Sequence, residues 1–340
     1  MRTLTCLLLA VLLFPAGGSA TAIGSPGQER GRSVLFRYST DGFWLNLHHF
    51  LYVLGRAEAK LPDRTRRAVA GAPDEAEAGL RGTDPEDVRA WRGAVTVYAG
   101  RLSRLDAVFD EPLVSITRAL ARLGGGSLDT AANLPADVRR ALNDAAPVYR
   151  RLFWPAHERA NLAWVERTQP QVDRHGDNVL ATVTRAYALP WPAGGYPVQV
   201  SAYANWAGAY STQGRLLVVS SLDPGLEGTL ALEIVVHEAM HQWDEDVDRA
   251  LAAAARDAGL TVAGDLSHAL IFYTAGEAVR RAVPGHVPYA EVSGIWSRRL
   301  GRFKAAIDAA WLPWLDGRVT REAALADLVR RAAGGGAANP

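Results

Sequence analysis

Cysteine is nearly absent from this chain of 340 residues. The one cysteine, Cys6, lies inside the apolar run from Leu4 to Phe14 and precedes the end of that run, whereas the cysteine of a lipoprotein follows it. The chain after this segment therefore contains no thiol. This absence excludes a disulfide framework and a zinc site built from cysteines.

The chain also lacks an excess of charge of either sign and, beyond its N-terminal segment, any long apolar run. Lys and Arg together number 37 against 36 Asp and Glu, for a formal net charge of +1. This balance gives no electrostatic reason to expect binding to nucleic acid or to an anionic membrane. No later stretch is long and apolar enough to cross a bilayer, so we expect no membrane span.

The first 20 residues have the features of a secretory signal peptide. Arg2 precedes the apolar run, and the small residues Gly17-Gly18-Ser19-Ala20 follow it, with cleavage expected after Ala20 or Ala22. The run is too short for a stable transmembrane helix. We therefore expect a secreted or periplasmic protein, long enough to bury a large core in one extended domain or two lobes.

The most informative motif is His237-Glu238-Ala239-Met240-His241, which has the pattern H-E-x-x-H. It follows the apolar residues 230–236, a lead-in typical of a largely buried helix, and residues 223–229 carry the Pro, Gly and Thr of a helix start. On a helix, His237 and His241 share one face and can bind one metal ion. In this arrangement two imidazoles hold Zn²⁺ and Glu238 takes a proton from water.

The motif resembles the zinc-binding signature of the zincin metallopeptidases, over this helix and its surroundings. The metzincin branch would need Gly at position 244 and His at position 247, where this chain has Asp244 and Val247. The resemblance is therefore to the gluzincin branch, whose third zinc ligand is a glutamate on a later helix. It implies Zn²⁺ as the cofactor and a peptide or protein as the substrate.

Glu277 is the preferred third ligand. It lies in the apolar segment 266–281, which has a helical pattern, and a carboxylate in such a segment needs a strong partner. Zinc is one such partner, and an ion pair with Arg280 or Arg281 is the alternative. Gluzincins similar to thermolysin have an aspartate four residues after this glutamate, to orient a zinc-bound histidine, whereas this chain has Arg281.

His268 and Asp265 are rival third ligands. His268 precedes Glu277 by nine residues, so the two side chains cannot face one metal ion from a continuous helix. We prefer Glu277 for its apolar surroundings and for the gluzincin-like order of motif, loop and helix. His268 would then cap the helix or support a ligand. Tyr273, four residues before Glu277, shares its face.

Amide hydrolysis also develops an oxyanion in its transition state. The metal, together with a protonated histidine or a tyrosine hydroxyl, stabilises this oxyanion. The Pro- and Gly-rich segment 283–289 offers His286 and Tyr289. We predict His286 as the catalytic residue here, because it follows the Glu277 helix closely. A solvent-exposed loop histidine is the alternative.

The one strongly β-like region precedes the motif. Residues 196–203 alternate between apolar and polar, and residues 215–221 form an apolar run. Between them, residues 205–212 hold small residues with Trp206 and Tyr210. This composition favours an exposed edge strand that accepts an extended peptide, as in zincins. A hairpin arm packed on the helices is the alternative.

Helical patterns dominate the rest of the chain, and loops are expected between them. The expected helices are Phe43 to Lys60 with Asp41 as N-cap, Pro85 to Asp106, Glu111 to Leu123, Ala136 to Leu152, Pro155 to Ala188, Tyr289 to Leu315 and Thr320 to Ala333. The expected loops are Pro62 to Thr83, Gly124 to Pro135 and Leu189 to Pro197. His48-His49, His157-Glu158 and His175 lack the spacing of metal ligands and are interpreted as structural.

The sequence thus predicts a mainly α protein with a small antiparallel sheet (α+β). It would comprise a signal peptide (1–20), a helical N-terminal region (21–190), a zincin-like metal-binding core with C-terminal helices (191–333) and a disordered tail (334–340). The predicted function is a secreted zinc metallopeptidase with His237, His241 and Glu277 as ligands and Glu238 as general base. The alternative is a secreted non-catalytic binding protein with a structural or vestigial metal. Four protein ligands are typical of structural zinc, and three of catalytic zinc.

Overall fold

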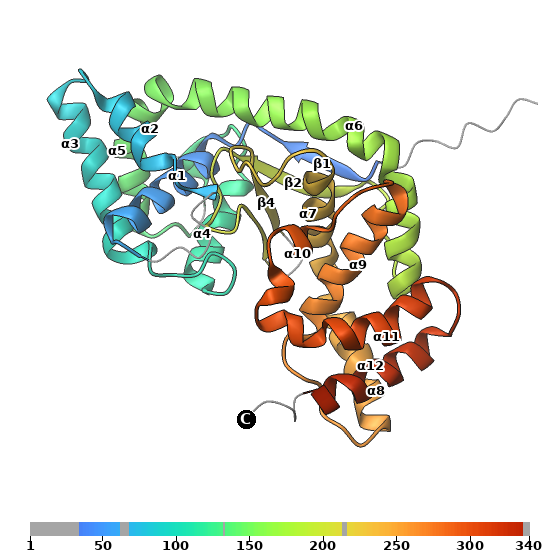
Figure 1. Cartoon of the computed structure of the whole chain (residues 1–340). Coiled ribbons are helices and arrows are strands. Elements are labelled where there is room, and N and C mark those ends of the chain that lie inside the picture. Colours follow the sequence, from blue (N-terminus) through green and yellow to red (C-terminus); the bar gives the residue numbers. More distant parts are fainter. Residues whose placement is uncertain (1–33, 62–67, 132, 213–215, 336–340) are drawn as a thin grey trace, which may run out of the picture. The chain divides into compact units, whose positions relative to one another are not determined.

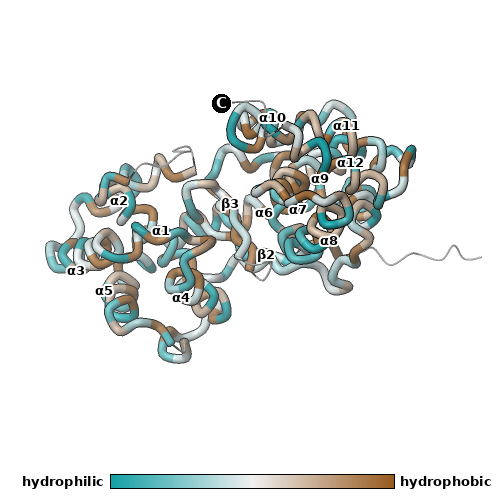
Figure 2. The backbone as a smooth tube through the Cα atoms, turned by 90° about the horizontal axis from the view of Figure 1, so that it is seen from below, coloured by the Kyte–Doolittle hydropathy of each residue, from teal (hydrophilic) through white to brown (hydrophobic). Residues whose placement is uncertain are grey.

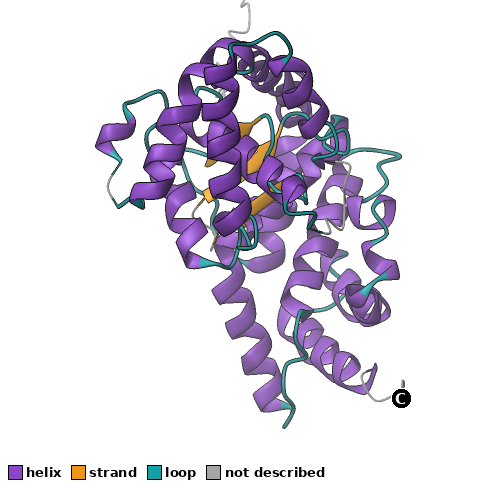
Figure 3. Ribbon diagram, turned by 90° about the vertical axis from the view of Figure 1, so that its left-hand side faces the viewer, coloured by secondary structure: helices purple, strands orange, loops and turns teal. Residues whose placement is uncertain are grey.

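Four strands form one mixed sheet in the computed structural model of this protein, which describes residues 34–61, 68–131, 133–212 and 216–335 (Figure 1). The strands are β1 (Phe36–Ser39), β2 (Tyr196–Ser201), β3 (Ala209–Thr212) and β4 (Leu216–Ser220). Their order is β1-β2-β4-β3, with β1, β2 and β4 parallel and β3 antiparallel to β4. Figure 3 shows the strands enclosed by helices.

Helices make up most of the remaining structure, as predicted. The α-helices are α1 (Phe43–Glu58), α2 (Ala72–Leu80), α3 (Pro85–Val97), α4 (Glu111–Ala121), α5 (Ala136–Leu152), α6 (Trp154–Tyr187), α7 (Gly228–Met240), α8 (Asp244–Asp257), α9 (Leu266–Ala282), α10 (Tyr289–Val292), α11 (Lys304–Leu315) and α12 (Arg321–Gly335). Short helical segments are η2 (Tyr98–Leu102), a π-helix, and the 3₁₀ turns η3 (Leu128–Thr130), η4 (His241–Trp243), η5 (Ile295–Ser297) and η6 (Arg299–Phe303).

The sheet separates two hydrophobic cores, because successive side chains of a strand point to opposite faces. On β4, Leu217 and Val219 enter a core shared with α6, α7, α8, α9, α11 and α12, here called the α7–α9 core. Leu216 and Val218 enter the other, shared with α1 to α5, here called the α1–α5 core. Figure 2 shows hydrophobic and hydrophilic residues mixed along the helices, as expected where each helix buries one face.

The sheet differs from the predicted antiparallel one because the chain contributes a strand that the sequence pattern did not reveal. β1, only four residues long, pairs in parallel with β2, Phe36 opposite Tyr196. β2 and β4 are also parallel, because the chain runs back through β3 between them. The strands expected within 196–203 and 215–221 are present, and β3 is at the edge of the sheet.

Most predicted helices are present within a few residues, and three predictions need correction. The segment 62–83 was expected to be a loop, but it contains α2, whose buried residues are the small Ala72 and Ala76. The helix expected from 289 to 315 is broken. Gly294 adopts a left-handed φ of 67°, and a Cβ at Gly301 would lie only 1.8 Å from the carbonyl oxygen of Trp296. The last helix, α12, includes residues 334 and 335, which were expected to be disordered.

The packing does not divide the chain at residue 190. The described residues form one compact unit, in which β1 from the first predicted region pairs with β2 from the second. α6 contacts α5 and also α7 and α9, so it runs past both cores (Figure 1). The predicted signal peptide and the last five residues lie outside the described residues. No helix in the described ranges has both the length and the hydropathy needed to cross a membrane.

His48 and His49 are structural, as the sequence interpretation proposed. Both are buried on α1. His48 lies 2.9 Å from the Tyr98 hydroxyl, and His49 bridges β2 and β3 by contacts of 3.2 Å with Ser201 and 2.7 Å with Tyr210. Burial lowers the pKa of His48 to about 3 and that of His49 well below its usual value.

We predict from these shifts that the protein loses stability as the pH falls below about 6.5. Below that pH the unfolded chain binds a proton at each of these histidines while the folded protein does not, so the free energy of unfolding decreases, for His48 until about pH 3. His49→Gln should reduce the pH slope of stability by up to about 1.4 kcal/mol per pH unit. Urea unfolding between pH 7 and 5 measures this slope, with His175→Gln as the control. Identical slopes for wild type and His49→Gln would contradict the assignment.

Candidate metal centre

Helices α7 and α9 pack antiparallel, and their contacts repeat once per helical turn. Glu233 of α7 lies against Gly276 of α9, since a Cβ at Gly276 would lie 3.2 Å from Oε1 of Glu233. One turn later the rings of His237 and Phe272 stack with centroids 3.7 Å apart. At the next turn the rings of His241 and His268 are 5.2 Å apart. These three contacts are called here the Glu233, His237 and His241 rungs.

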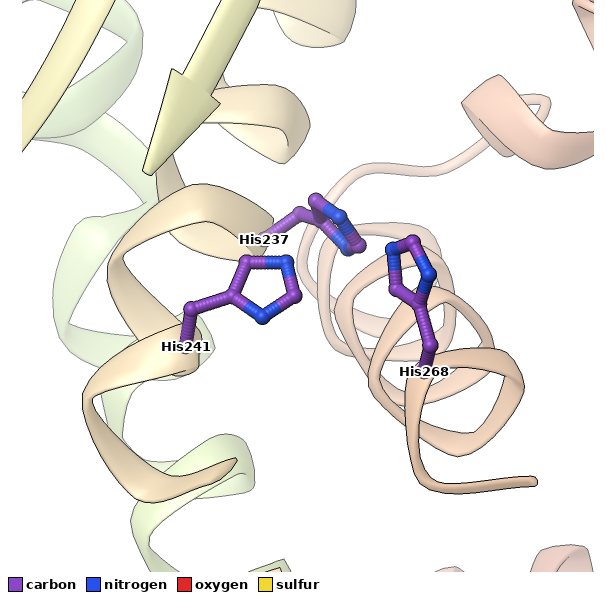
Figure 4. A group of neighbouring side chains, drawn as sticks. All are labelled: His237, His241 and His268. Carbon is purple, nitrogen blue, oxygen red and sulfur yellow. The ribbon is translucent and has the colours of Figure 1, made fainter. Parts of the chain in front are cut away.

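Three imidazoles converge at the last two rungs. The possible ligand atoms of His237, His241 and His268 all lie within 4.8 Å of one another. Figure 4 shows the rings of His237 and His241 from one helix and of His268 from another turned toward a common space. Zn–N bonds of about 2.0–2.1 Å in a tetrahedral site place ligand nitrogens about 3.4 Å apart. Small side-chain rotations therefore suffice to complete a three-histidine site.

Asp244 orients one of these rings. Both of its carboxylate oxygens lie close to Nδ1 of His241, at 2.9 and 3.1 Å. This contact leaves Nε2 of His241 available as a ligand atom. A carboxylate bound to the outer nitrogen of a histidine is the usual support of a metal ligand. Helix α7 ends at Met240, and the 3₁₀ turn η4 brings Asp244, the first residue of α8, back to His241.

The electrostatics of His237 and His268 suit metal binding, which requires neutral imidazoles. Burial, with His241 and His268 beside it, lowers the pKa of His237 well below its usual value. Desolvation and the neighbouring His241 lower the pKa of His268 to about 4. Burial also acts to lower the pKa of His241, but Asp244 and Glu238 outweigh it and leave that pKa raised. Nδ1 of His237 is buried and has no hydrogen-bond partner among the described residues, as expected where a ligand completes the group.

Glu238 lies beside this group and is partly exposed. Desolvation raises the pKa of its carboxyl group to about 7, with a further rise from Asp244, against the opposing effects of His241 and of a backbone hydrogen bond from Ser211. The hydrogen bond fixes Glu238 against β3, on which α7 packs. A carboxyl group with a pKa near neutrality is suited to exchange protons with water.

Glu277, the third ligand preferred from the sequence, is not part of the group. Its carboxylate is hydrogen-bonded to Arg280 and lies 3.7 Å from Arg281, which in turn binds Asp316. The ion pair with the two arginines, considered above as the alternative, is therefore what the structure contains. The apolar segment did require a strong partner for this carboxylate, and two arginines one turn away provide it. His268, nine residues earlier, faces the two motif histidines instead.

The other sequence-based candidates lie elsewhere. Asp265, with a left-handed φ of 67° before α9, is ion-paired with Arg299 at 3.0 Å and Arg302 at 3.7 Å. His286 does not face a substrate: Nδ1 is 2.9 Å from the Thr229 hydroxyl and Nε2 is 2.6 Å from the Glu233 carboxylate. The backbone N–H of Tyr289 donates to the same carboxylate at 2.8 Å. The predicted oxyanion role of His286 therefore has no support in this geometry.

The exposed edge expected at residues 205–212 is also corrected. β3 lies at the edge of the sheet, but all four of its residues are buried. Tyr210 is 2% exposed and its hydroxyl contacts His49, so this segment is packed on the helices. The alternative reading of a packed hairpin arm describes it better than an accessible binding strand.

The donor set fits Zn²⁺ better than a hard cation such as Mg²⁺ or Ca²⁺. Those ions prefer oxygen ligands, whereas three imidazoles suit Zn²⁺ and related transition metals. His241 is partly exposed and His268 is exposed, so the group opens to solvent on one side. Among the described residues the group contains three protein ligands. Three rather than four is the number found at catalytic zinc.

Comparison with known proteins adds no assignment to this geometry, since no family model, curated protein or solved structure matches the chain. Sequence reasoning missed the roles of Asp244, Phe272 and Glu233. Only the spacing of Asp244, three residues after a motif histidine, was a usable signal for its role. The partners of Phe272 and Glu233 lie on the other helix, which the sequence alone does not position.

A first test separates the two possible third ligands. We predict that His268→Ala loses most of the zinc affinity, because it removes one of three imidazoles, and that Glu277→Gln keeps it. Zn²⁺ binding to the purified variants can be measured by competition with a chromogenic chelator. Strong binding by His268→Ala together with loss in Glu277→Gln would restore the glutamate as the ligand.

A second test concerns Asp244. We predict that Asp244→Ala weakens Zn²⁺ binding about 10- to 100-fold, because His241 loses the carboxylate that orients its ring. Asp248→Ala is the matched control, since it removes the same charge from an exposed position one turn further along α8. The same chelator competition measures both variants. Equal affinities in the two variants would contradict the role of Asp244 in orienting His241.

Proposed function

We propose that this protein is a secreted zinc-dependent hydrolase, a metallopeptidase that cleaves amide bonds in peptides or proteins. The observation that carries the proposal is the convergence of His237, His241 and His268 beside Glu238, with an open side toward solvent. The H-E-x-x-H pattern and its resemblance to zincins support the same reading. The third ligand proposed here is a histidine from α9, in place of the gluzincin glutamate.

The residues of the chain take distinct roles in this proposal. His237, His241 and His268 would hold Zn²⁺, and Asp244 would keep Nε2 of His241 directed to it. When bound, Zn²⁺ supplies a Lewis acid that makes water more acidic and polarises a substrate carbonyl. Glu238 accepts a proton from water on its carboxylate and afterwards donates one to the departing amine. The Ser211 hydrogen bond holds the carboxylate in place between these steps.

The competing hypothesis is a non-catalytic binding protein with a structural metal. A structural zinc site is closed by four protein ligands. Asp265 and Glu277, the two carboxylates that the sequence offered as further ligands, are both held by arginines. The exposure of the group to solvent and its three rather than four protein ligands therefore favour the hydrolase.

We predict that Glu238→Gln retains zinc but lowers hydrolysis about 10²- to 10⁴-fold, because the amide cannot accept the proton. Digestion of a peptide library, with and without chelator, measures the activity, and chelator competition measures the zinc. Glu245→Gln, an exposed glutamate on α8, is the matched control and should behave as wild type. Full activity in Glu238→Gln would end the general-base assignment, and failure of the wild type to cleave any library member would end the hydrolase proposal.

A further inference from the structure

The Glu233 rung is the meeting point of α7, α9 and the loop that follows α9. Glu233 lies one turn before His237 and is 1% exposed. Its Oε2 accepts hydrogen bonds from Nε2 of His286 at 2.6 Å and from the backbone N–H of Tyr289 at 2.8 Å. Thr229, a further turn back on α7, contacts the other nitrogen of His286 at 2.9 Å. The loop after α9 is thus bound to α7 at two successive turns.

The third component of this rung is Gly276 of α9. A Cβ there would lie 2.8 Å from Cβ of Pro288 and 3.2 Å from Oε1 of Glu233, which is closer than side chains normally approach. Glycine therefore allows α9 to lie directly against the glutamate and the loop. Oε1 of Glu233 is buried and, among the described residues, has no hydrogen-bond partner. A buried ionisable pair with one unsatisfied oxygen is costly, so its presence needs a reason other than stability.

We propose that the Glu233–His286 pair is a positioning device for the metal centre, fixing the separation of α7 and α9 so that their imidazoles converge. The His237 and His241 rungs follow the Glu233 rung at intervals of one turn along both helices. A helix is stiff over two turns, so a change of separation at the Glu233 rung is passed on to the histidines. Directional hydrogen bonds set this separation more narrowly than apolar contacts do. The inference rests on the proposed metal centre, but not on hydrolysis.

The chain contains a control, a second histidine–glutamate pair whose histidine is buried and whose glutamate side chain is 30% exposed. Nε2 of His157 lies 2.9 Å from Glu75, and its Nδ1 lies 2.8 Å from the Tyr149 hydroxyl. His157 is 1% exposed, like the side chain of His286. It joins α6 to α2, neither of which carries a motif histidine. Loss of this pair should affect folding without changing the separation of α7 and α9.

The experiment compares zinc affinity in His286→Leu and His157→Leu, by chelator competition with Zn²⁺ alone on the full secreted protein. We expect His286→Leu to weaken binding about 10- to 100-fold, as is found for residues that orient metal ligands. His157→Leu should bind within about twofold of wild type, because distant sites act independently. Urea unfolding of the zinc-free proteins shows how much stability each variant loses. Gly276→Ala, which widens the same rung without removing a hydrogen bond, should also weaken zinc binding.

A double variant keeps the test decisive if His286→Leu does not fold. Glu233→Met combined with His286→Leu replaces the pair by apolar side chains, a change that often preserves stability. Weaker zinc binding in this stable variant would support the positioning role. Wild-type affinity in the folded variants, or equal losses in His286→Leu and His157→Leu, would overturn it. A wild-type protein that binds no Zn²⁺ would instead overturn the metal centre itself, and the positioning role with it.

Discussion

The antiparallel packing of α7 on α9 is the constraint on which the candidate centre depends. Neither helix carries three ligands: the motif supplies two histidines, and the third lies 27 residues beyond the second. The pairing of His241 with His268, and of His237 with Phe272, turns this sequence distance into contact. The same register places Gly276 against Glu233. The antiparallel register of α7 and α9 therefore positions both the three histidines and the buried Glu233–His286 pair.

The surroundings of these helices hold that relation in place. α7 packs on β3 and β4, and α9 packs on α6, within a core that reaches α12. Asp244 connects the end of α7 to the start of α8, and Ser211 connects the edge strand to Glu238. His241 and Glu238 are thus held by different elements. A site assembled in this way is rigid at its ligands while one side stays open to solvent.

The sequence predicted the parts of this account that depend on local pattern. H-E-x-x-H on an apolar helix, the strands within 196–203 and 215–221, and the long helix α6 with its internal Pro170 all follow from periodicity and composition. It did not reveal β1 or α2, because four residues or two buried alanines give too little periodic signal. The break after residue 292 depends on Gly294 and Gly301, whose effect comes from backbone conformation and from a close approach to Trp296.

The sequence alone did not decide correctly between His268 and Glu277 as the third member of the candidate metal group. The helical phase correctly showed that His268 and Glu277 face different sides of α9. Glu277 was preferred because a carboxylate in an apolar segment needs a strong partner. Arg280 and Arg281 are that partner. His268 was judged by its place near a helix start, although its exposure is what an open metal site requires. His286 follows α9 in the chain, but its two ring nitrogens contact Thr229 and Glu233, so its predicted oxyanion role stays without support. These outcomes depend on which side chains meet across helices, which one sequence without a fold does not specify.

X-ray absorption spectroscopy of the zinc-loaded protein tests the central claim most directly, because it counts imidazoles in the metal's first shell. We predict three imidazole nitrogens at about 2.0–2.1 Å and a further light atom from solvent. A shell with two imidazoles and a protein carboxylate would return the third position to Glu277. A closed shell of four protein ligands, or no bound zinc, would contradict the proposed hydrolase.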